Sequence, residues 1–416
     1  MNILLIQTGI SNNLSILMGM GNQNRMNMPM LGLLYIESVT PSDINVKVVD
    51  EIHGLVEKFE FYDIVGISGM TMHANRMYYL ADQYKRLGCH VVLGGVHVSF
   101  MIEEALQHCD TVVVGEGENL WGEFLTDFKN GNAKRVYYPV KPIDLCELPK
   151  LKLKLVDGKA YNPPYGTLNS IVATRGCPNN CSFCCVKKMF NGKFRIRPAD
   201  HVIKELLDLG DGFIMFQDDN IVGNQQFAEE LFTKMIPLKR HWGGQGSINI
   251  ANNDKVLDLM EISGCNALFV GFESINPKNI NFISKSGVNK TEKYKEQIKK
   301  LHDKGIRIVG SFIVGFDDDS ESVFDDIYEF VENNSIEFPI VNCLTPFPGT
   351  DLYKQFESEK RIIDYNWENY TLTNVVIQPK HMSSDRLQYK YNLLSYYLGK
   401  LVRGNFFSNS TRRTQF

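Results

Sequence analysis

The chain has 416 residues, of which 44% are hydrophobic and 22% are charged, and this composition excludes a disordered or fibrous protein. A formal net charge of -4 shows no excess of the basic residues that nucleic-acid-binding proteins carry, so we expect no nucleic-acid partner. Because a domain averages roughly 150 residues, the length predicts two or three domains.

The N-terminal segment and the cysteine content predict a cytoplasmic protein. The first residues form a short apolar run without the charged and long apolar regions of a secretory signal. No apolar stretch reaches the roughly 18 residues that cross a bilayer. In the cytoplasm the 9 cysteines would stay reduced, so metal binding or burial must account for them.

Short apolar strands alternate with helical stretches over residues 1–135, which predicts a doubly wound, Rossmann-like parallel sheet. The expected strands are 3–6, 46–49, 64–68, 91–93 and 111–114. A turn that carries glycine or a polar group follows each of them, and in such sheets ligands bind beyond the carboxyl ends of the strands. A single turn of this kind simply ends a strand, but three together predict a ligand crevice. The residues expected to line it are Ser68, Gly94, Gly95, Gly115 and Glu116.

A linker with scattered prolines is expected over 136–168, and a second βα series over 169–350. Six βα steps predict a partial (β/α)6 barrel of the TIM type, with active-site residues at the carboxyl ends of its strands. Residues 351–416 are expected to form a small helical cap and substrate region. The predicted strands are 170–174, 213–217, 245–249, 267–271, 308–314 and 340–344, and the predicted helices are 202–209, 224–235, 291–304 and 389–401.

Three cysteines, Cys177, Cys181 and Cys184, follow the first strand of the second series directly. A zinc site normally has four ligands, and no matching second pair of cysteines follows, so an iron-sulfur cluster fits better. Three local ligands on a 4Fe-4S cluster leave one iron open to bind another molecule. The neighbouring Cys185 is assigned to packing. Cys343, at a strand end, is retained as an active-site candidate, with simple burial as the alternative.

With the aromatic Phe183 before the third cysteine, this motif resembles the signature of the radical S-adenosylmethionine enzymes. Over roughly residues 1–380 the chain resembles the branch of that superfamily with an N-terminal cobalamin-binding-type domain. The segments that carry the resemblance are Gly94-Gly95-Val96-His97, Gly115-Glu116-Gly117-Glu118-Asn119-Leu120-Trp121, Gln217-Asp218-Asp219-Asn220, Gly271-Phe272-Glu273-Ser274, Gly310-Ser311-Phe312-Ile313-Val314-Gly315-Phe316 and Thr345-Pro346-Phe347-Pro348-Gly349-Thr350.

The resemblance implies that S-adenosylmethionine binds the open iron and that an electron from the cluster splits its carbon-sulfur bond, which yields a 5'-deoxyadenosyl radical. It also implies flavodoxin or ferredoxin as the reductant. Residues at strand ends would hold the cofactor. For Asp218 the alternative is helix capping, and for Pro346 a plain turn. The candidates are Phe183, Asp218, Ser247, Glu273 and Pro346.

The first domain lacks one mark of cobalamin-binding domains, the histidine of an Asp-x-His-x-x-Gly turn, because the turn here begins Gln7-Thr8-Gly9. The pair Gly94-Gly95 and the turn at Ser68 do match the family, where they leave room for the corrin and its nucleotide tail. His73 and His97 are alternative cobalt ligands, although ordinary histidines at a polar rim are the preferred interpretation. Arg195 and Arg197 are expected either to bind a carboxylate or phosphate, or to form a solvated charged strand.

The resemblance favours cobalamin-dependent methylation of an unactivated carbon in a natural product, lipid or tetrapyrrole-like substrate. Radical cyclisation or rearrangement, with a first domain that binds no cobalamin, stays open. A non-enzymatic alternative is a binding protein in which the cysteines staple a structural metal. The aromatic residues of the last segment fit either a substrate pocket or an ordinary cap, and they are Tyr365, Trp367, Tyr370 and Phe406.

Overall fold

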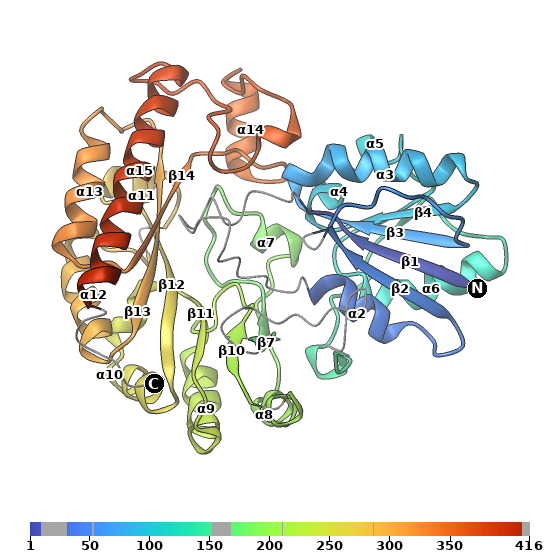
Figure 1. The fold of residues 1–416 in the computed structure, drawn as a ribbon, viewed down its shortest axis with the longest axis horizontal. Coiled ribbons are helices and arrows are strands. Elements are labelled where there is room, and N and C mark those ends of the chain that lie inside the picture. Colours follow the sequence, from blue (N-terminus) through green and yellow to red (C-terminus); the bar gives the residue numbers. More distant parts are fainter. Residues whose placement is uncertain (10–30, 52–53, 152–167, 210, 286, 410–416) are drawn as a thin grey trace.

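The computed structural model describes residues 1–9, 31–51, 54–151, 168–209, 211–285 and 287–409. Two α/β units lie side by side, one built from the N-terminal third of the chain and the other from its middle (Figure 1). Within these ranges no helix is both long and apolar enough to cross a membrane.

The first unit is a parallel sheet of six strands in the order β2-β1-β3-β4-β5-β6, which confirms the doubly wound architecture. Its side chains alternate between two cores: Ile3 and Leu5 pack with the helices on one face, and Leu4 and Ile6 pack with those on the other. The strands are β1 Asn2–Gln7, β2 Asn45–Asp50, β3 Ile64–Ser68, β4 His90–Gly94, β5 Thr111–Val113 and β6 Val136–Tyr137, and the main helices are α2 Leu31–Val39, α3 Ala74–Arg86 and α6 Glu118–Lys129.

The second unit is a parallel sheet of six strands in the order β14-β13-β12-β11-β10-β7. Because β7 and β14 stand at the two edges, the sheet curves without closing, as a partial barrel does. The strands are β7 Leu168–Ile171, β10 Phe213–Phe216, β11 Trp242–Gly246, β12 Cys265–Glu273, β13 Arg307–Val314 and β14 Phe338–Cys343, and the main helices are α8 Ala199–Asp208, α9 Gln225–Met235, α10 Asp254–Ile262, α11 Pro277–Phe282, α12 Tyr294–Asp303 and α13 Val323–Asn333.

Two predicted strands of the barrel differ from those observed. Strand β11 begins at Trp242, three residues before the expected start, and residues 248–252 form a short 3-10 helix instead. The glycines of β11 hid it in the sequence because glycine has a low strand propensity. The expected strand 170–174 ends early, and Thr174–Arg175 forms β8 of an antiparallel ribbon with β9, Arg195–Ile196.

The C-terminal region has two parts with different roles. Leu352 and Phe356 of α14 (Asp351–Ser358), together with Trp367 and Tyr370, join the apolar cluster of the first unit. Helix α15, Ser384–Asn409, packs instead along the barrel beside α13 and β14 (Figure 1). The first part therefore ties the two units together, while the last helix extends the barrel wall.

Candidate functional site

The three cysteines of the motif lie on one loop between the two units. All three are free and half-buried, and the Cys184 amide donates a hydrogen bond of 3.1 Å to the Cys181 carbonyl. The Ser182 amide donates to the Ile283 carbonyl at 3.1 Å, and its carbonyl accepts from the Leu352 amide at 3.0 Å. Burial raises the pKa of the Cys181 thiol to about 11. The loop is thus fixed between α11 and α14.

Two aspartates that follow β10 hold the start of this loop. Asp218 is buried, and its carboxylate accepts hydrogen bonds from the backbone amides of Ala173, at 3.1 Å, and Thr174. Asp219 accepts from the Gly176 amide at 3.0 Å. Asp218 was expected to hold the cofactor. In the structure its carboxylate instead accepts hydrogen bonds from the backbone just before Cys177.

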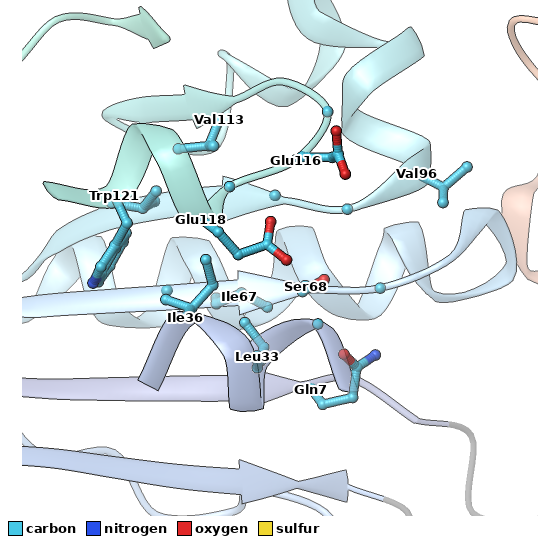
Figure 2. A pocket seen from close by; sticks show the side chains of 18 of the residues that line it. Gln7, Leu33, Ile36, Ile67, Ser68, Val96, Val113, Glu116, Glu118 and Trp121 are labelled. Atoms are coloured by element: carbon cyan, nitrogen blue, oxygen red, sulfur yellow. The ribbon is translucent and has the colours of Figure 1, made fainter. Parts of the chain in front are cut away.

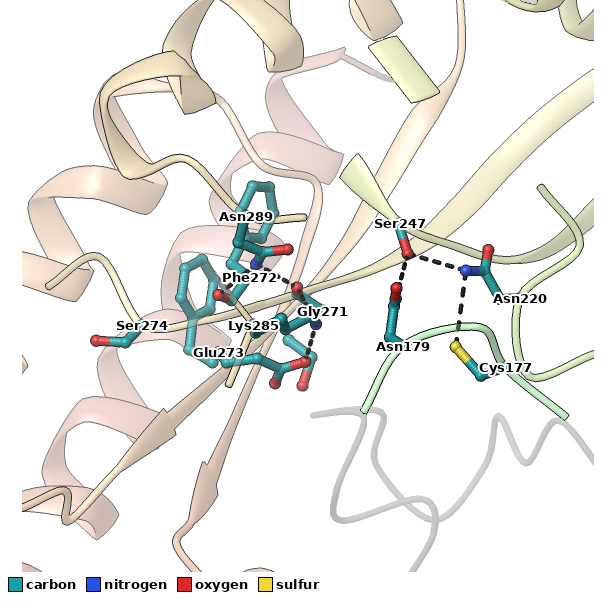
Figure 3. A network of polar contacts seen from close by, with 12 residues as sticks. Cys177, Asn179, Asn220, Ser247, Gly271, Phe272, Glu273, Ser274, Lys285 and Asn289 are labelled. Atoms are coloured by element: carbon teal, nitrogen blue, oxygen red, sulfur yellow. Dashed lines mark hydrogen bonds and ion pairs between the residues drawn. The ribbon is translucent and has the colours of Figure 1, made fainter. Parts of the chain in front are cut away.

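Ser247 reaches the cysteine loop through two asparagines (Figure 3). Its Oγ accepts hydrogen bonds from Asn220 Nδ2 at 3.0 Å and from Asn179 Nδ2 at 3.2 Å. Asn220 Nδ2 also lies 3.8 Å from Cys177 Sγ. We did not select Asn220 from the sequence, although it directly follows the two aspartates.

Glu273 lies at a register shift of β12 with a backbone φ of 65°, in the left-handed region that residues other than glycine rarely adopt. Its Oε1 accepts a hydrogen bond of 2.6 Å from Lys285 Nζ, and Lys285 also donates to the Gly271 carbonyl at 2.8 Å (Figure 3). Burial opposes the charge of Lys285, but Glu273 and Cys181 outweigh it and raise the pKa of the lysine. Sequence reasoning missed Lys285, because only the fold brings it to Glu273.

The segment after β14 runs between the two units. Pro346 is buried, and Gly349, with φ of 82°, leaves no space for a side chain because an added Cβ would lie 2.3 Å from the Phe100 ring. Thr350 caps α14 by accepting a hydrogen bond from the Tyr353 amide at 3.0 Å. The half-buried Phe183 packs against the apolar cluster of the first unit that α14 also joins.

The first unit contains a pocket of about 260 Å³ at the carboxyl ends of its strands (Figure 2). Its inner part is apolar, with the Trp121 indole at one end. An added Cβ at Gly94 would meet only the Val113 carbonyl oxygen, at 3.9 Å, so this glycine keeps the pocket open. All five residues predicted to line a crevice lie around this pocket, and they are Ser68, Gly94, Gly95, Gly115 and Glu116.

Residues of the second unit complete the pocket: Arg175, Met189 and Phe190 lie on its wall. Arg175 Nη1 donates to Glu116 at 2.7 Å, and its Nη2 donates to Glu118 at 2.5 Å. The pocket therefore shares Arg175 with the strand that leads into the cysteine loop. Sequence reasoning did not select Arg175, because its partners lie almost sixty residues earlier.

Of the two alternatives for Arg195 and Arg197, the solvated strand is wrong, because both arginines contact carboxylates of the chain itself. Arg195 donates to Glu116 at 2.9 Å and to the Ile143 carbonyl at 2.7 Å. Arg197 is 5% exposed and donates to Glu205 at 2.6 Å. Both guanidinium groups join segments of the fold. Their ion pairs compensate the cost of burying the charge.

His73 and His97 are not among the described residues that line the pocket. His97 is completely buried, with its Nε2 at 3.2 Å from the Tyr78 hydroxyl and 3.4 Å from Glu104. Burial lowers the pKa of His73 to about 4. Both histidines belong to the packing of the first unit and not to a polar rim. Cys343 is likewise buried, and its thiol lies 3.8 Å from the Thr373 carbonyl oxygen.

The residues present fit the two groups that the sequence implies. Three free thiols on a single fixed loop are the donors that an iron-sulfur cluster takes. In the part of the chain that the structure describes, no three His, Cys, Asp or Glu side chains are grouped closely enough to hold a single metal ion. The apolar pocket, left open at Gly94, suits a flat apolar part of a larger ligand, such as the base of a corrinoid's nucleotide tail.

Comparison with known proteins matches both units to families. The model for the radical SAM superfamily matches residues 171–331, and the model for the B12 binding domain matches residues 23–125. Bacteriochlorophyllide d C-12(1)-methyltransferase of Chlorobaculum tepidum is 34% identical over 378 residues, which is 88% of this chain and 82% of that protein. The C-8(2)-methyltransferase of the same organism is 32% identical over 86% of this chain and 83% of that protein.

Solved structures share the fold. The radical S-adenosylmethionine methyltransferase TsrM from Kitasatospora setae, with cobalamin and a 4Fe-4S cluster bound, superposes with a TM-score of 0.66 at 14% identity and covers 86% of this chain and 78% of that chain. The cobalamin-dependent radical enzyme OxsB superposes with a TM-score of 0.70 at 14% identity, over 97% of this chain and 67% of that one.

Proposed function

Because this chain belongs to the radical S-adenosylmethionine superfamily and carries a B12-binding domain, we propose that it is a cobalamin-dependent methyltransferase acting on an unactivated carbon. The observation that carries the proposal is the lining of the first unit's pocket, which includes Arg175, two residues before Cys177, and Met189 and Phe190, which follow the cysteine loop. A methyl donor and a radical generator must lie close to one substrate, and this arrangement supports that requirement.

When bound, a 4Fe-4S cluster supplies the electron that cleaves S-adenosylmethionine, and a corrinoid supplies the methyl group. Cys177, Cys181 and Cys184 would hold the cluster on the fixed loop. Glu273, with Lys285 beside it, would orient polar groups of S-adenosylmethionine. A buried carboxylate held in a strained backbone conformation is typical of such positioning roles.

The neighbouring residues would shape the rest of this site. Ser247 is held by Asn179 and Asn220 at the edge of the cysteine loop, which supports a role in orienting a hydroxyl or amine. Pro346 and Phe183 are apolar and partly or wholly buried, so they would limit the access of water to a reactive radical.

The substrate class that we propose is a tetrapyrrole. This rests on two relatives above 30% identity that are both named as bacteriochlorophyllide methyltransferases. A more distant relative, 26% identical over 81% of this chain, is the hopanoid C-2 methylase of Rhodopseudomonas palustris. We further propose that the enzyme works in the cytoplasm, takes its electron from a flavodoxin or ferredoxin, and has no nucleic-acid partner.

The proposal is tested by anaerobic turnover. The full chain, reconstituted with iron, sulfide and hydroxocobalamin, is incubated with reductant, a bacteriochlorophyllide and S-adenosylmethionine deuterated at its methyl group. We expect a product that contains one deuterated methyl group and, in step with it, 5'-deoxyadenosine. An unlabelled product that has only lost hydrogen would contradict methyl transfer and favour radical cyclisation instead.

A further inference from the structure

Four buried charges join the first unit to the ribbon that leads into the cysteine loop. Arg175 donates one Nη to Glu116 and the other to Glu118, and Arg195 donates to Glu116 at 2.9 Å. The exposed fractions of the four side chains lie between 5% and 15%. With two arginines and two glutamates, the cluster is neutral. Removing one member leaves a buried charge without compensation, which is costly.

The arginines and the cysteine loop form one rigid piece. Arg175 in β8 pairs with Arg195 in β9, so the ribbon presents both guanidinium groups to the same side. Gly176, the single residue between Arg175 and Cys177, has φ of 89° and packs so closely that an added Cβ would lie 2.3 Å from the Lys193 carbonyl oxygen. Its amide is held by Asp219. A displacement of Arg175 must therefore displace Cys177.

The same charges face the pocket of the first unit. Glu116, Glu118 and Arg175 all lie on its wall, which Leu33 and Ser68 also line (Figure 2). Met189 and Phe190, which follow the cysteine loop, line the pocket from the second unit. A molecule in the pocket would thus touch the ion pairs directly and would touch both ends of the cysteine-containing segment.

We propose that Arg175 is a positioning residue that couples occupancy of the first-unit pocket to the arrangement of the cysteine loop. The inference rests on the proposed function, because the pocket must take a corrinoid and the loop a cluster. The planar guanidinium of Arg175 engages two carboxylates at once, which the ammonium group of a lysine cannot do with the same geometry. The Tyr35 ring, 5.2 Å from the guanidinium carbon, further restricts its orientation.

Coupling between two sites means that each ligand changes the affinity for the other by the same factor. The affinity of the full chain for hydroxocobalamin is measured by absorbance under argon, once with the cluster reconstituted and once without it. We expect the cluster to tighten binding by roughly fivefold or more. In Arg175→Gln we expect the affinities with and without the cluster to be equal. In Arg175→Lys the ratio of the two affinities should lie between those of the wild type and Arg175→Gln. Arg361→Gln is the matched control, since it removes a similarly buried pair, with Asp317, away from the pocket, and should keep the full ratio.

A second variant keeps the coupling testable if the first variant does not fold. If circular dichroism shows that Arg175→Gln does not fold, Glu118→Gln removes one of the same contacts from the other unit and should lower the ratio in the same direction. Equal affinities in the wild-type chain, or an unchanged ratio in folded Arg175 and Glu118 variants, would overturn the coupling alone. Failure of both forms of the wild-type chain, with and without the cluster, to bind hydroxocobalamin would instead contradict the proposed function.

Discussion

Glu273 and Lys285 form a buried ion pair, with 9% of each side chain exposed, at the edge of the proposed cofactor site. A pair of this kind is expensive to bury, and its value lies in holding a carboxylate in one orientation. The positive φ of Glu273 also indicates that this residue is held in one orientation, because a strained backbone persists only where its surroundings hold it.

Breaking the pair should be more harmful than removing it. We expect Lys285→Met to lower the free energy of unfolding by about 3 kcal/mol, because Glu273 is left buried without a partner. The double variant Lys285→Met/Glu273→Met should recover most of that loss. Urea denaturation of the wild type, Lys285→Met, Glu273→Met and the double variant measures both effects. Additive losses in the double variant would show that the two charges do not depend on each other.

Asp319 gives a second prediction for single residues, through pH. Burial raises the pKa of this carboxyl to about 6, although the Gly315 and Phe316 amides and Asn279 donate to it. A raised pKa in the folded state means that the stabilisation from protonated Asp319 is complete below about pH 4 and is lost as the pH rises through 6. The stability of the wild type relative to Asp319→Asn should therefore fall by on the order of 2 kcal/mol between pH 4 and pH 7. Denaturant titrations at both pH values measure the difference, and a constant difference would refute the assignment.

At the scale of elements, runs of apolar residues predicted most of the strands. The predicted strands 3–6 and 308–314 lie within β1 and β13. The two-residue strand β6 gives no period and was taken for linker, and only the fold reveals its pairing with β5, which was itself predicted as strand 111–114. The pocket residues were predicted because parallel strands end at a common edge. Arg175, Lys285 and Asn220 were missed because their contacts join segments distant in the sequence.

The strand-end glycine of β4 should decide whether the pocket can be filled. In Gly94→Val the new side chain projects into the space that the glycine leaves open, so we expect hydroxocobalamin affinity to fall by roughly tenfold or more, with little change in the thermal midpoint. Gly122→Val is the control, because that glycine faces open space on the exposed side of α6. Equal affinities in the two variants would mean that the ligand does not occupy this pocket.

At the scale of the whole molecule, several contacts among the described residues hold the units in their relative position, and two of them lie close to the proposed site. One is the arginine-glutamate cluster beside the pocket, and the other is the apolar segment that begins with α14. In that segment Trp367 donates a hydrogen bond of 2.9 Å to Glu104, and its ring lies 5.1 Å from the His97 ring. If the substrate binds between the units, as the proposed function requires, its site would depend on both contacts. Of the aromatic residues left open from the sequence, Trp367 and Tyr370 are buried, Tyr365 is exposed, and the side chain of Phe406 lies outside the described part.

Trp367→Ala should loosen the joint between the units. We expect a loss of about 3 to 5 kcal/mol in the free energy of unfolding, because a large buried ring and its hydrogen bond disappear together. Tyr365→Ala, at an exposed aromatic two residues earlier, should have almost no effect. Guanidinium denaturation followed by circular dichroism compares them, and equal losses would show that the segment does not join the units.

Above all, the proposed function requires that the cysteine loop carry a cluster that cleaves S-adenosylmethionine. The most direct measurement is the release of 5'-deoxyadenosine by the reduced, reconstituted chain under argon, compared with Cys181→Ala. The wild-type chain should release it, whereas the variant should keep its secondary structure by circular dichroism and release none, because a thiol that binds the cluster is gone. Release by Cys181→Ala, or none from a wild-type chain whose cluster is confirmed by its electron paramagnetic resonance, would contradict the account.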